Sequence, residues 1–242
     1  MICLRWRCLA SVAMCTLFAC PSTVLETPIK IVFLGDSVTY GVRPEEGVRD
    51  EHIFAALVES QLKRKFSAIE VVNSGVPGNN TRDVFARLKR DVLVHRPSYV
   101  FVMLGLNDAH LVDQGLARKG PRVPLAEFKR NMKKIVARCQ KGETKVVLLT
   151  PNPITRRYIH SGVGLYRGRE MNFLLRDYVG AIMACALQSG TPVIDIFSMS
   201  EHERDLDELL SDGMHPNTLG HRVIANVIEQ FLINDIAQTL AK

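Results

Sequence analysis

A chain of 242 residues, 47% hydrophobic and 23% charged and without visible repeats or low-complexity tracts, predicts one globular domain with a sizeable core. Its net charge of +6 comes from basic residues spread in short clusters without interleaved aromatics, such as Lys63-Arg64-Lys65 and Lys133-Lys134. We interpret these clusters as solvated faces, so a nucleic-acid partner is not expected.

The N-terminal residues 1–19 are predicted to be a secretory signal peptide rather than part of the fold. Arg5 and Arg7 form a basic region, and the uncharged apolar stretch Cys8–Ala19 follows it. This stretch is shorter than the roughly 20 residues that cross a bilayer, and it matches the apolar part of a signal peptide. A buried N-terminal helix is the alternative. The protein is therefore expected to be exported, with residues 20–242 forming a single domain.

The end of this segment resembles a bacterial lipobox. In Leu17-Phe18-Ala19-Cys20, Cys20 would become the lipidated first residue of the mature protein. Phe18 is bulkier than that motif usually has, and Pro21 follows at once, so cleavage without lipidation remains the alternative. A membrane partner is expected only if Cys20 carries a lipid.

The cysteines predict neither a metal site nor a defined disulfide. Cys3, Cys8 and Cys15 lie in the signal segment, where they behave as small apolar residues. Cys139 and Cys185 lie near the ends of predicted helices, and an oxidising compartment would permit a bridge between them. Their spacing does not show that the two Cα atoms approach closely enough. No CxxC motif or Cys/His cluster suggests a metal, and no cofactor is expected.

Apolar, β-branched runs alternate with helical patterns along the rest of the chain. The predicted strands are Ile29–Leu34, Ile69–Asn73, Tyr99–Leu104, Lys145–Thr150 and Val193–Asp195. The predicted helices, in which apolar residues recur at helical spacing, are His52–Lys65, Thr81–His95, Leu125–Cys139, Glu170–Gln188 and Thr218–Leu240. All strands but the last, which is too short to judge, are near-continuous apolar runs. This pattern predicts an α/β fold with a five-stranded parallel sheet covered on both faces.

Polar loops directly follow three of the predicted strands. Gly35-Asp36-Ser37 follows the first, Pro77-Gly78-Asn79-Asn80 the second and Gly105-Leu106-Asn107-Asp108 the third. Because ligands of parallel sheets bind outside the carboxyl ends of the strands, we expect all three loops at one edge of the sheet. Each loop taken alone is also a plausible turn or helix cap.

A fourth polar segment, Asp212-Gly213-Met214-His215-Pro216, opens the last predicted helix. The spacing of three residues lets the Asp212 carboxylate reach the Nδ1–H group of His215, which leaves Nε2 to take a proton from a hydroxyl. In isolation, the segment is better explained as a capped helix start.

Together the four segments supply the groups for acyl transfer through a serine nucleophile. Ser37 is the expected nucleophile, with His215 and Asp212 as its base. The expected oxyanion donors are the N–H groups of Ser37 and Gly78 and the side-chain amide of Asn107. The sequence around Ser37 is not the Gly-x-Ser-x-Gly elbow of α/β-hydrolases, so that fold is not expected.

These segments resemble the sequence blocks of the GDSL-type, or SGNH, hydrolases. Gly-Asp-Ser-Val-Thr-Tyr-Gly (35–41) is similar to the first block, with Val38 where the family name has leucine. Residues 71–81 resemble the second block, in which Gly78 matches the oxyanion glycine and Gly75 is the alternative. Residues 105–108 and 212–217 resemble the third and fifth blocks. The resemblance implies a three-layer α/β/α, flavodoxin-like sandwich and metal-independent ester hydrolysis.

Two loops are candidates for substrate recognition. The polar insertion Val42–Glu51 could form one wall of a pocket, and the long connection Pro151–Gly168 follows the fourth strand on the active-site side. Its candidate substrate contacts are Arg156, Arg157, Tyr158, Tyr166 and Arg167, with a solvated loop as the alternative. His110 either lines the pocket or is a surface histidine.

Export, polar loops that carry arginines, and the lack of a long apolar lid favour a short acyl ester on a carbohydrate as the substrate. The alternatives are a lysophospholipase or lipase-like esterase, an O-acyltransferase that modifies cell-envelope sugars with the same residues, and a non-catalytic binding module. The oligomeric state does not follow from the sequence.

Overall fold

The computed structural model describes residues 28–42, 50–113, 119–161, 166–201 and 206–240. Its centre is a five-stranded parallel sheet with the strand order β2-β1-β3-β6-β7. The strands are β1 (Ile29–Gly35), β2 (Ile69–Gly75), β3 (Tyr99–Met103), β6 (Lys145–Leu149) and β7 (Val193–Ile194). The five predicted strands are confirmed, with small shifts at their carboxyl ends.

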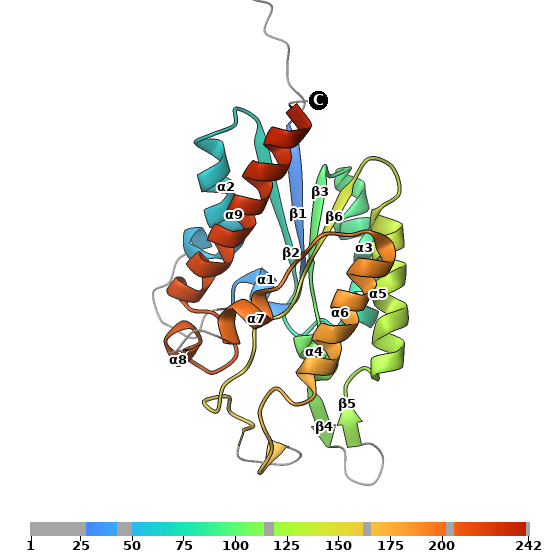
Figure 1. Cartoon of the computed structure of the whole chain (residues 1–242), viewed down its shortest axis with the longest axis vertical. Coiled ribbons are helices and arrows are strands. Elements are labelled where there is room, and N and C mark those ends of the chain that lie inside the picture. The colour runs from blue at the N-terminus through green and yellow to red at the C-terminus, as the bar shows by residue number, and fades with distance from the viewer. Residues whose placement is uncertain (1–27, 43–49, 114–118, 162–165, 202–205, 241–242) are drawn as a thin grey trace, which may run out of the picture.

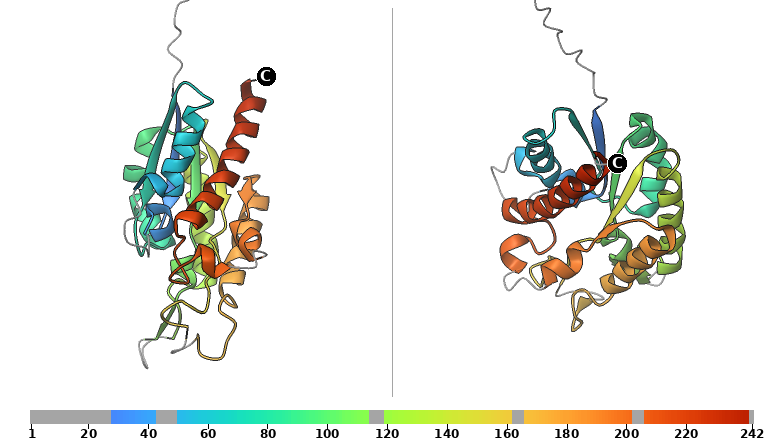
Figure 2. Two further views of the ribbon diagram at one scale, coloured as in Figure 1. Left: turned by 90° about the vertical axis from the view of Figure 1, so that its left-hand side faces the viewer. Right: turned by 45° about the horizontal axis from the view of Figure 1, so that its top comes forward.

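Helices cover both faces of the sheet, which confirms the predicted three-layer α/β/α sandwich. On one face α2 (Phe54–Lys63) packs against α9 (Thr218–Leu240). The other face carries α3 (Thr81–Asp91), α5 (Leu125–Cys139) and α6 (Leu175–Ser189), as Figure 1 shows. Figure 1 and the left view of Figure 2 show the end of α9 and the start of β1 at the same end of the molecule. The start of α9 therefore lies near the carboxyl ends of the strands.

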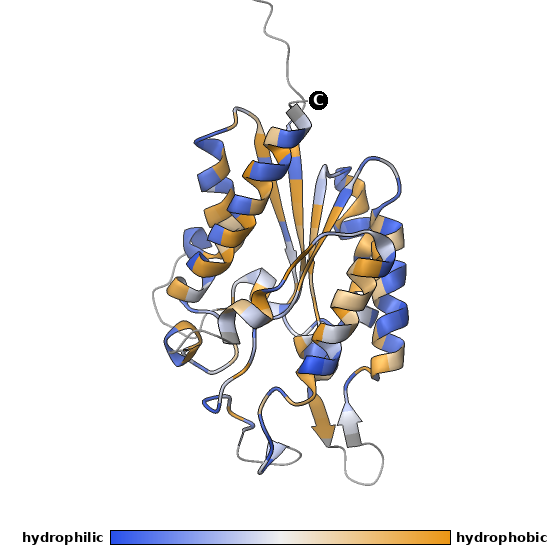
Figure 3. Ribbon diagram, in the orientation of Figure 1, coloured by the Kyte–Doolittle hydropathy of each residue, from blue (hydrophilic) through white to orange (hydrophobic). Residues whose placement is uncertain are grey.

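The strands are apolar because both faces of the sheet are buried. Every residue of β3 is buried, and Figure 3 shows apolar colour along the strands and on the inward faces of the helices. The ring of Phe33 in β1 lies 5.1 Å from that of Phe101 and 5.2 Å from that of Phe54 in α2. Phe101 also contacts Phe231 of α9, with ring centroids 6.1 Å apart. These rings join the sheet to the α2–α9 layer.

Short elements near the ends of the long ones were not predicted. They are α1 (Ser37–Tyr40), α4 (Leu106–Ala109), α7 (Ile196–Glu201), α8 (Leu206–Leu209), the antiparallel hairpin of β4 (Leu111–Asp113) and β5 (Lys119–Pro121), and 3₁₀ turns at Asp50–His52 and Leu93–His95. Each is too short to give a recognisable hydrophobic period.

The start of the helix predicted at Glu170–Gln188 was wrong, because α6 begins at Leu175. The Asn172 side chain instead bonds to both backbone groups of Ile154, accepting from its N–H at 2.8 Å and donating to its carbonyl at 3.0 Å. This long-range contact holds residues 170–174 in turns. The other helices begin or end within a few residues of the predicted positions.

Cys139 and Cys185 are both buried and free, so the bridge between them that the sequence left open is not formed. Burial raises the pKa of the Cys139 thiol to about 12. Within the described residues, no helix combines the length and apolar character needed to cross a membrane. Residues 1–27 lie outside the described part, so the signal peptide and lipidation at Cys20 remain predictions.

Candidate active site

Ser37 lies at the tight turn between β1 and α1, where it is buried. Gly35 is required here, since a Cβ at this position would lie 2.1 Å from Thr39 Oγ1 and 2.7 Å from the Met103 carbonyl oxygen. Asp36 caps α1, with its Oδ1 accepting the Val38 N–H at 3.0 Å. Ser37 is therefore the first residue of a helix, where N–H groups have no partner inside the helix.

The His215 imidazole bridges Ser37 and Asp212. Its Nε2 lies 3.0 Å from the Ser37 Oγ, and its Nδ1 lies 2.7 Å from Asp212 Oδ2. The other carboxylate oxygen of Asp212 accepts the backbone N–H groups of Met214 at 2.9 Å and His215 at 2.7 Å. This arrangement leaves the Nε2 lone pair of a neutral imidazole facing the Ser37 hydroxyl.

Asp212 is ionised at neutral pH. Burial alone would raise its pKa, but the hydrogen bonds from the His215 side chain and from the N–H groups of His215 and Met214 outweigh burial and lower the pKa to about 2. A carboxylate at this position can only accept, so Nδ1 of His215 carries the proton in the contact.

The loop that follows β6 holds the Asp212–His215 segment in place. The Thr155 N–H donates to the Gly213 carbonyl at 2.8 Å, and Asn152 Nδ2 donates to the Met214 carbonyl at 2.9 Å. Gly213 has a φ of +80°, and a Cβ there would lie 2.3 Å from the backbone nitrogen of Tyr158. We expected this loop only to contact substrate, whereas the structure also gives it a supporting role.

Asn107 lies in α4, directly after β3, and both ends of its amide are bonded. Its Nδ2 donates to Asp36 Oδ2 at 3.3 Å, and its Oδ1 accepts from Arg122 Nη1 at 3.3 Å. Burial raises the pKa of Asp36 to about 6. Asn107 is thus linked to the Ser37 turn by its hydrogen bond to Asp36, the residue before Ser37.

Of the two glycines after β2, Gly78 is the one whose N–H is available. The Gly75 N–H already donates to Asn73 Oδ1 at 2.9 Å, and a Cβ at Gly75 would lie 2.1 Å from the Tyr40 nitrogen. Gly78 is exposed, with a φ of +78°, and its N–H has no partner in the part of the chain that the structure describes. Its carbonyl accepts from Arg122 Nη1 at 3.1 Å.

Asp108 joins the Asn107 turn to the start of α3. The buried Asp108 carboxylate accepts the N–H of Thr81 at 3.0 Å and its hydroxyl at 2.6 Å. Burial raises the pKa of Asp108 to about 6. The loops after β2 and β3 are therefore held together by a buried carboxylate.

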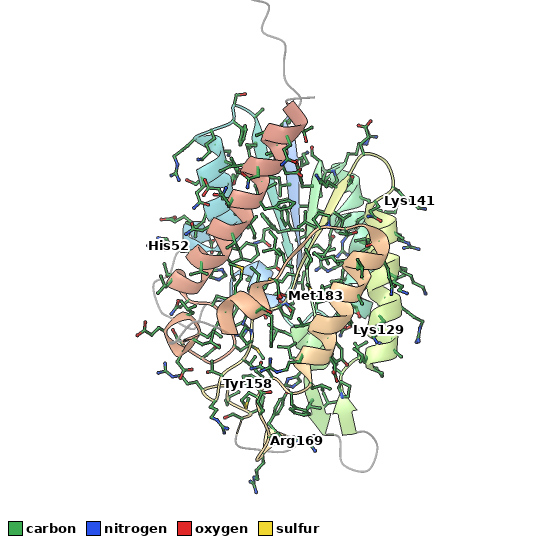
Figure 4. The ribbon with its side chains drawn as sticks, in the orientation of Figure 1. His52, Lys129, Lys141, Tyr158, Arg169 and Met183 are labelled. Carbon is green, nitrogen blue, oxygen red and sulfur yellow. The ribbon has the colours of Figure 1, made fainter. Side chains whose placement is uncertain are left out.

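Three of the predicted substrate contacts form one cluster beside α4. The hydroxyl of Tyr158 lies 3.1 Å from His110 Nδ1, and the hydroxyl of Tyr166 accepts the Leu111 N–H at 3.2 Å. Burial, with the nearby Arg122 and His160, lowers the pKa of His110 to about 4. Figure 4 shows Tyr158 at the end of the molecule where the strands terminate, far from Lys141 at the opposite end.

The predicted arginine contacts do not join this cluster. Arg156, Arg157 and Arg167 are exposed, and Arg157 pairs with Asp207 at 3.3 Å. Residues 43–49 of the predicted loop Val42–Glu51 and residues 162–165 of the predicted loop Pro151–Gly168 lie outside the described residues.

A small apolar cavity of about 10 Å³ lies beside the cluster. Its lining includes Leu106 and Met214, the sequence neighbours of Asn107 and His215. This volume corresponds to about one water molecule. Two larger hollows, of about 680 and 710 Å³, share Leu93 and Arg96 and lie away from Ser37. Among the described residues, no group of three or more His, Cys, Asp or Glu side chains is arranged to hold a metal ion.

Sequence reasoning missed Arg122, Asn152 and Asn172, which support the site. All are single polar residues outside any recognisable pattern, and their partners lie far away in the sequence. The only available signal for Asn152 was its place in the long loop after the fourth predicted strand.

Comparison with known proteins identifies the family. The model of the GDSL-like lipase/acylhydrolase family matches residues 33–223. The isoamyl acetate-hydrolyzing esterase 1 homolog of Homo sapiens is 27% identical over 226 residues, which cover 88% of this chain and 84% of that protein. The acetylxylan esterase of Geobacillus stearothermophilus is 27% identical over 213 residues, covering 81% of this chain and 90% of that protein.

A solved structure shares the fold over most of the chain. The crystal structure of the lipase/acylhydrolase from Enterococcus faecalis matches with a TM-score of 0.67 and 26% sequence identity, covering 84% of this chain and 94% of that one. The family match spans most of the chain and includes the Ser37, Asn107 and His215 segments. The chain therefore belongs to the GDSL-like lipase/acylhydrolase family of carboxylic ester hydrolases.

Proposed function

We propose that the protein is a serine esterase in which Ser37, His215 and Asp212 form the catalytic triad, and that it removes short acyl groups, above all acetyl, from carbohydrates. The observation that carries this proposal is the hydrogen-bonded chain from Asp212 through His215 to the Ser37 hydroxyl, at 2.7 and 3.0 Å. Such a chain is the arrangement that activates a serine hydroxyl.

In the acylation step, Ser37 Oγ attacks the ester carbonyl carbon while His215 Nε2 takes its proton. The carbonyl oxygen becomes negatively charged and accepts hydrogen bonds from the N–H groups of Ser37 and Gly78 and from the amide of Asn107. The protonated His215 then gives its proton to the departing alcohol oxygen as the C–O bond breaks. Asp212 stabilises the imidazolium without taking the proton.

In the deacylation step, water takes the place of the alcohol. His215 Nε2 removes a proton from the water, whose oxygen attacks the acyl carbon of the Ser37 ester. The second tetrahedral intermediate collapses when His215 returns the proton to Ser37 Oγ, which releases the carboxylic acid. The chemistry needs no group other than those of the chain and water.

The names of the relatives support an acetyl group as the acyl part. Both protein relatives described above are named for acetate esters, one of a polysaccharide and the other of a branched alcohol. A carbohydrate as the alcohol part is favoured by the acetylxylan esterase relative and by the predicted export.

The test is a panel of natural esters assayed with the wild type and Ser37→Ala. We expect acetate release from acetylated xylan that disappears in the variant, and little fatty-acid release from lysophosphatidylcholine. Predominant fatty-acid release would show that the substrate is a lipid and not an acylated carbohydrate. Transfer of acetyl to an added sugar in preference to water would indicate an acyltransferase. Equal rates for wild type and variant would contradict the triad.

We also infer that residues 1–19 direct export and that Cys20 is a candidate for lipidation. The basic and apolar parts of this segment support the inference. Intact mass of the protein recovered from cells tests it. A chain that keeps residues 1–19 contradicts export, and an unmodified chain that starts beyond residue 20 contradicts lipidation.

A further inference from the structure

Arg122 connects the two loops that carry the expected oxyanion donors. One nitrogen of its guanidinium, Nη1, donates to the Gly78 carbonyl at 3.1 Å and to Asn107 Oδ1 at 3.3 Å. We propose that Arg122 is a positioning residue of the oxyanion hole, which holds the Asn107 amide and the Gly78 turn so that their N–H groups converge on the reacting carbonyl oxygen. This inference rests on the proposed serine esterase function.

The orientation of the Asn107 amide follows from its two partners. A guanidinium group can only donate, and an ionised carboxylate can only accept. Oδ1 of Asn107 therefore faces Arg122, and Nδ2 faces Asp36. The NH₂ group has two hydrogens, so after the bond to Asp36 one remains for the substrate. With partners at both ends, the amide can neither flip nor rotate freely.

The Gly78 turn has little packing to hold it. Gly78 is exposed, and a Cβ built on it would meet no atom within 4 Å. The turn is tied to the molecule by hydrogen bonds, among them the one from Arg122 to its carbonyl and one from Arg87 Nε to Asn79 Oδ1 at 2.7 Å. Removing Arg122 would loosen the peptide that carries an oxyanion donor.

The backbone at Arg122 is itself bound to the Asn107 loop. The Arg122 N–H donates to the His110 carbonyl at 2.9 Å, and the N–H of the buried Val123 donates to the Asp108 carbonyl at 3.0 Å. These bonds flank Asn107 on its carboxyl side, next to the β4–β5 hairpin (Figure 1). The side chain thus starts from an anchored position and reaches across to the Gly78 loop.

A positioning role and a substrate-binding role give different kinetics. If Arg122 acts on the oxyanion donors, its loss weakens an interaction made in the transition state, so kcat falls while KM changes little. If Arg122 binds the ground-state substrate, KM rises instead. Since loss of a whole oxyanion donor lowers kcat by about 10²–10³, imperfect placement of two donors is expected to lower kcat by about 10–100-fold.

The experiment compares Arg122→Gln, Arg122→Lys and Arg122→Gly with p-nitrophenyl acetate as substrate. Arg122→Gln should lower kcat by about 10–100-fold with KM within about threefold of the wild-type value. Arg122→Lys keeps the charge but not the planar fork, and should recover part of the loss. Millimolar guanidinium should raise kcat of Arg122→Gly and leave the wild type unchanged. Arg138→Gln, an exposed arginine stacked on Phe85 and remote from Ser37, is the matched control.

Two results would overturn the inference: an unchanged kcat in Arg122→Gln, or a rise in KM that accounts for the whole loss of kcat/KM. If Arg122→Gln fails to fold, Arg122→Lys replaces it in the test. An unchanged kcat in that variant, or a rise in KM that accounts for its whole loss of kcat/KM, would then overturn the inference. Ser37→Ala distinguishes this failure from that of the proposed function. An active Ser37→Ala contradicts the triad and the oxyanion hole together, whereas an inactive one with full kcat in Arg122→Gln contradicts only the role of Arg122.

Discussion

The Ser37 hydroxyl and Nε2 of His215 lie 3.0 Å apart, although 178 positions separate the two residues in the chain. They meet because β1 ends just before Ser37 and α9 begins just after His215. Helix α9 packs against α2, and this contact places its first residues at the carboxyl edge of the sheet. The geometry of the candidate triad therefore depends on the packing of one helical layer.

Replacing Asp212 by Asn tests the tautomer of His215. An Asn oxygen can still accept the Met214 and His215 N–H groups, but its NH₂ group would face Nδ1 in place of a carboxylate oxygen. The imidazole would then carry its proton on Nε2, where it cannot accept the Ser37 proton. We expect kcat for p-nitrophenyl acetate to fall by about 10³–10⁴ with an unchanged melting temperature. A loss below tenfold would contradict the role of Asp212.

Gly213→Ala tests the support of the Asp212–His215 segment by the loop after β6. The new Cβ would lie 2.3 Å from the Tyr158 backbone nitrogen, and no rotamer change can relieve a contact with backbone. Gly142→Ala is the matched control, because Gly142 also has a positive φ, +89°, but its Cβ would meet nothing within 4 Å.

Both glycine variants carry the backbone strain of an L-residue at positive φ, about 1 kcal/mol. Gly213→Ala should also push the Asp212–His215 segment away from the loop after β6. We therefore expect an additional destabilisation of about 2 kcal/mol or more and a large loss of kcat. Urea unfolding and p-nitrophenyl acetate hydrolysis measure the two effects. Equal stability and activity in the two variants would show that the loop contact does not support the site.

Asp36 is expected to reduce stability at neutral pH. Burial raises the pKa of Asp36 from 3.8 to about 6, so the folded protein binds this proton more tightly than the unfolded chain does. The free energy of unfolding therefore falls as pH rises from about 4 to about 6, by up to about 3 kcal/mol for this one group.

Asp36→Asn removes this titration, so the stability of the variant relative to the wild type should increase with pH across that window. Its kcat should fall, because an amide oxygen cannot replace both carboxylate oxygens that accept from Val38 and Asn107. Urea unfolding at pH 4 and pH 7 measures the difference. Parallel pH dependences in the two proteins would show that Asp36 does not titrate in this window.

His110 is expected to make the protein less stable in mild acid. Its folded-state pKa of about 4 lies below the usual value of 6.5, so between these values the unfolded chain binds the proton and the folded protein does not. Stability should thus fall as pH drops from about 6.5 to about 4. His110→Gln, which can still bond to Tyr158, should lack this contribution. Melting temperatures of both proteins at pH 7 and pH 4.5 check it, and equal shifts would contradict it.

The sheet and its long helices were predictable because their signals are local. Buried parallel strands are near-continuous apolar runs, and β1, β3 and β6 have this form. The polar loops after β1, β2 and β3 were predictable as well, because the carboxyl ends of parallel strands lie at one edge of the sheet. By contrast, the start of α6 depends on Asn172, whose side chain is hydrogen-bonded to the backbone of Ile154. No local pattern reveals that contact.

The supporting residues of the site could not be predicted for the same reason. Arg122 belongs to no recognisable motif, and it reaches Asn107 and Gly78 from a backbone position that is hydrogen-bonded to the His110 carbonyl. Arg157 carried an equally plausible signal for substrate binding, yet it pairs with Asp207 at the surface. Long charged side chains find partners that their sequence neighbours do not specify.

The central claim is that Ser37 is the nucleophile, and covalent trapping of that hydroxyl tests it most directly. Treatment with a fluorophosphonate, followed by mass spectrometry of the peptides, should find one adduct per chain, on Ser37, formed in proportion to the loss of esterase activity. The adduct should be missing in Ser37→Ala and form far more slowly in His215→Ala. Complete inactivation with the label on another residue, or full activity after Ser37 is labelled, would contradict the assignment.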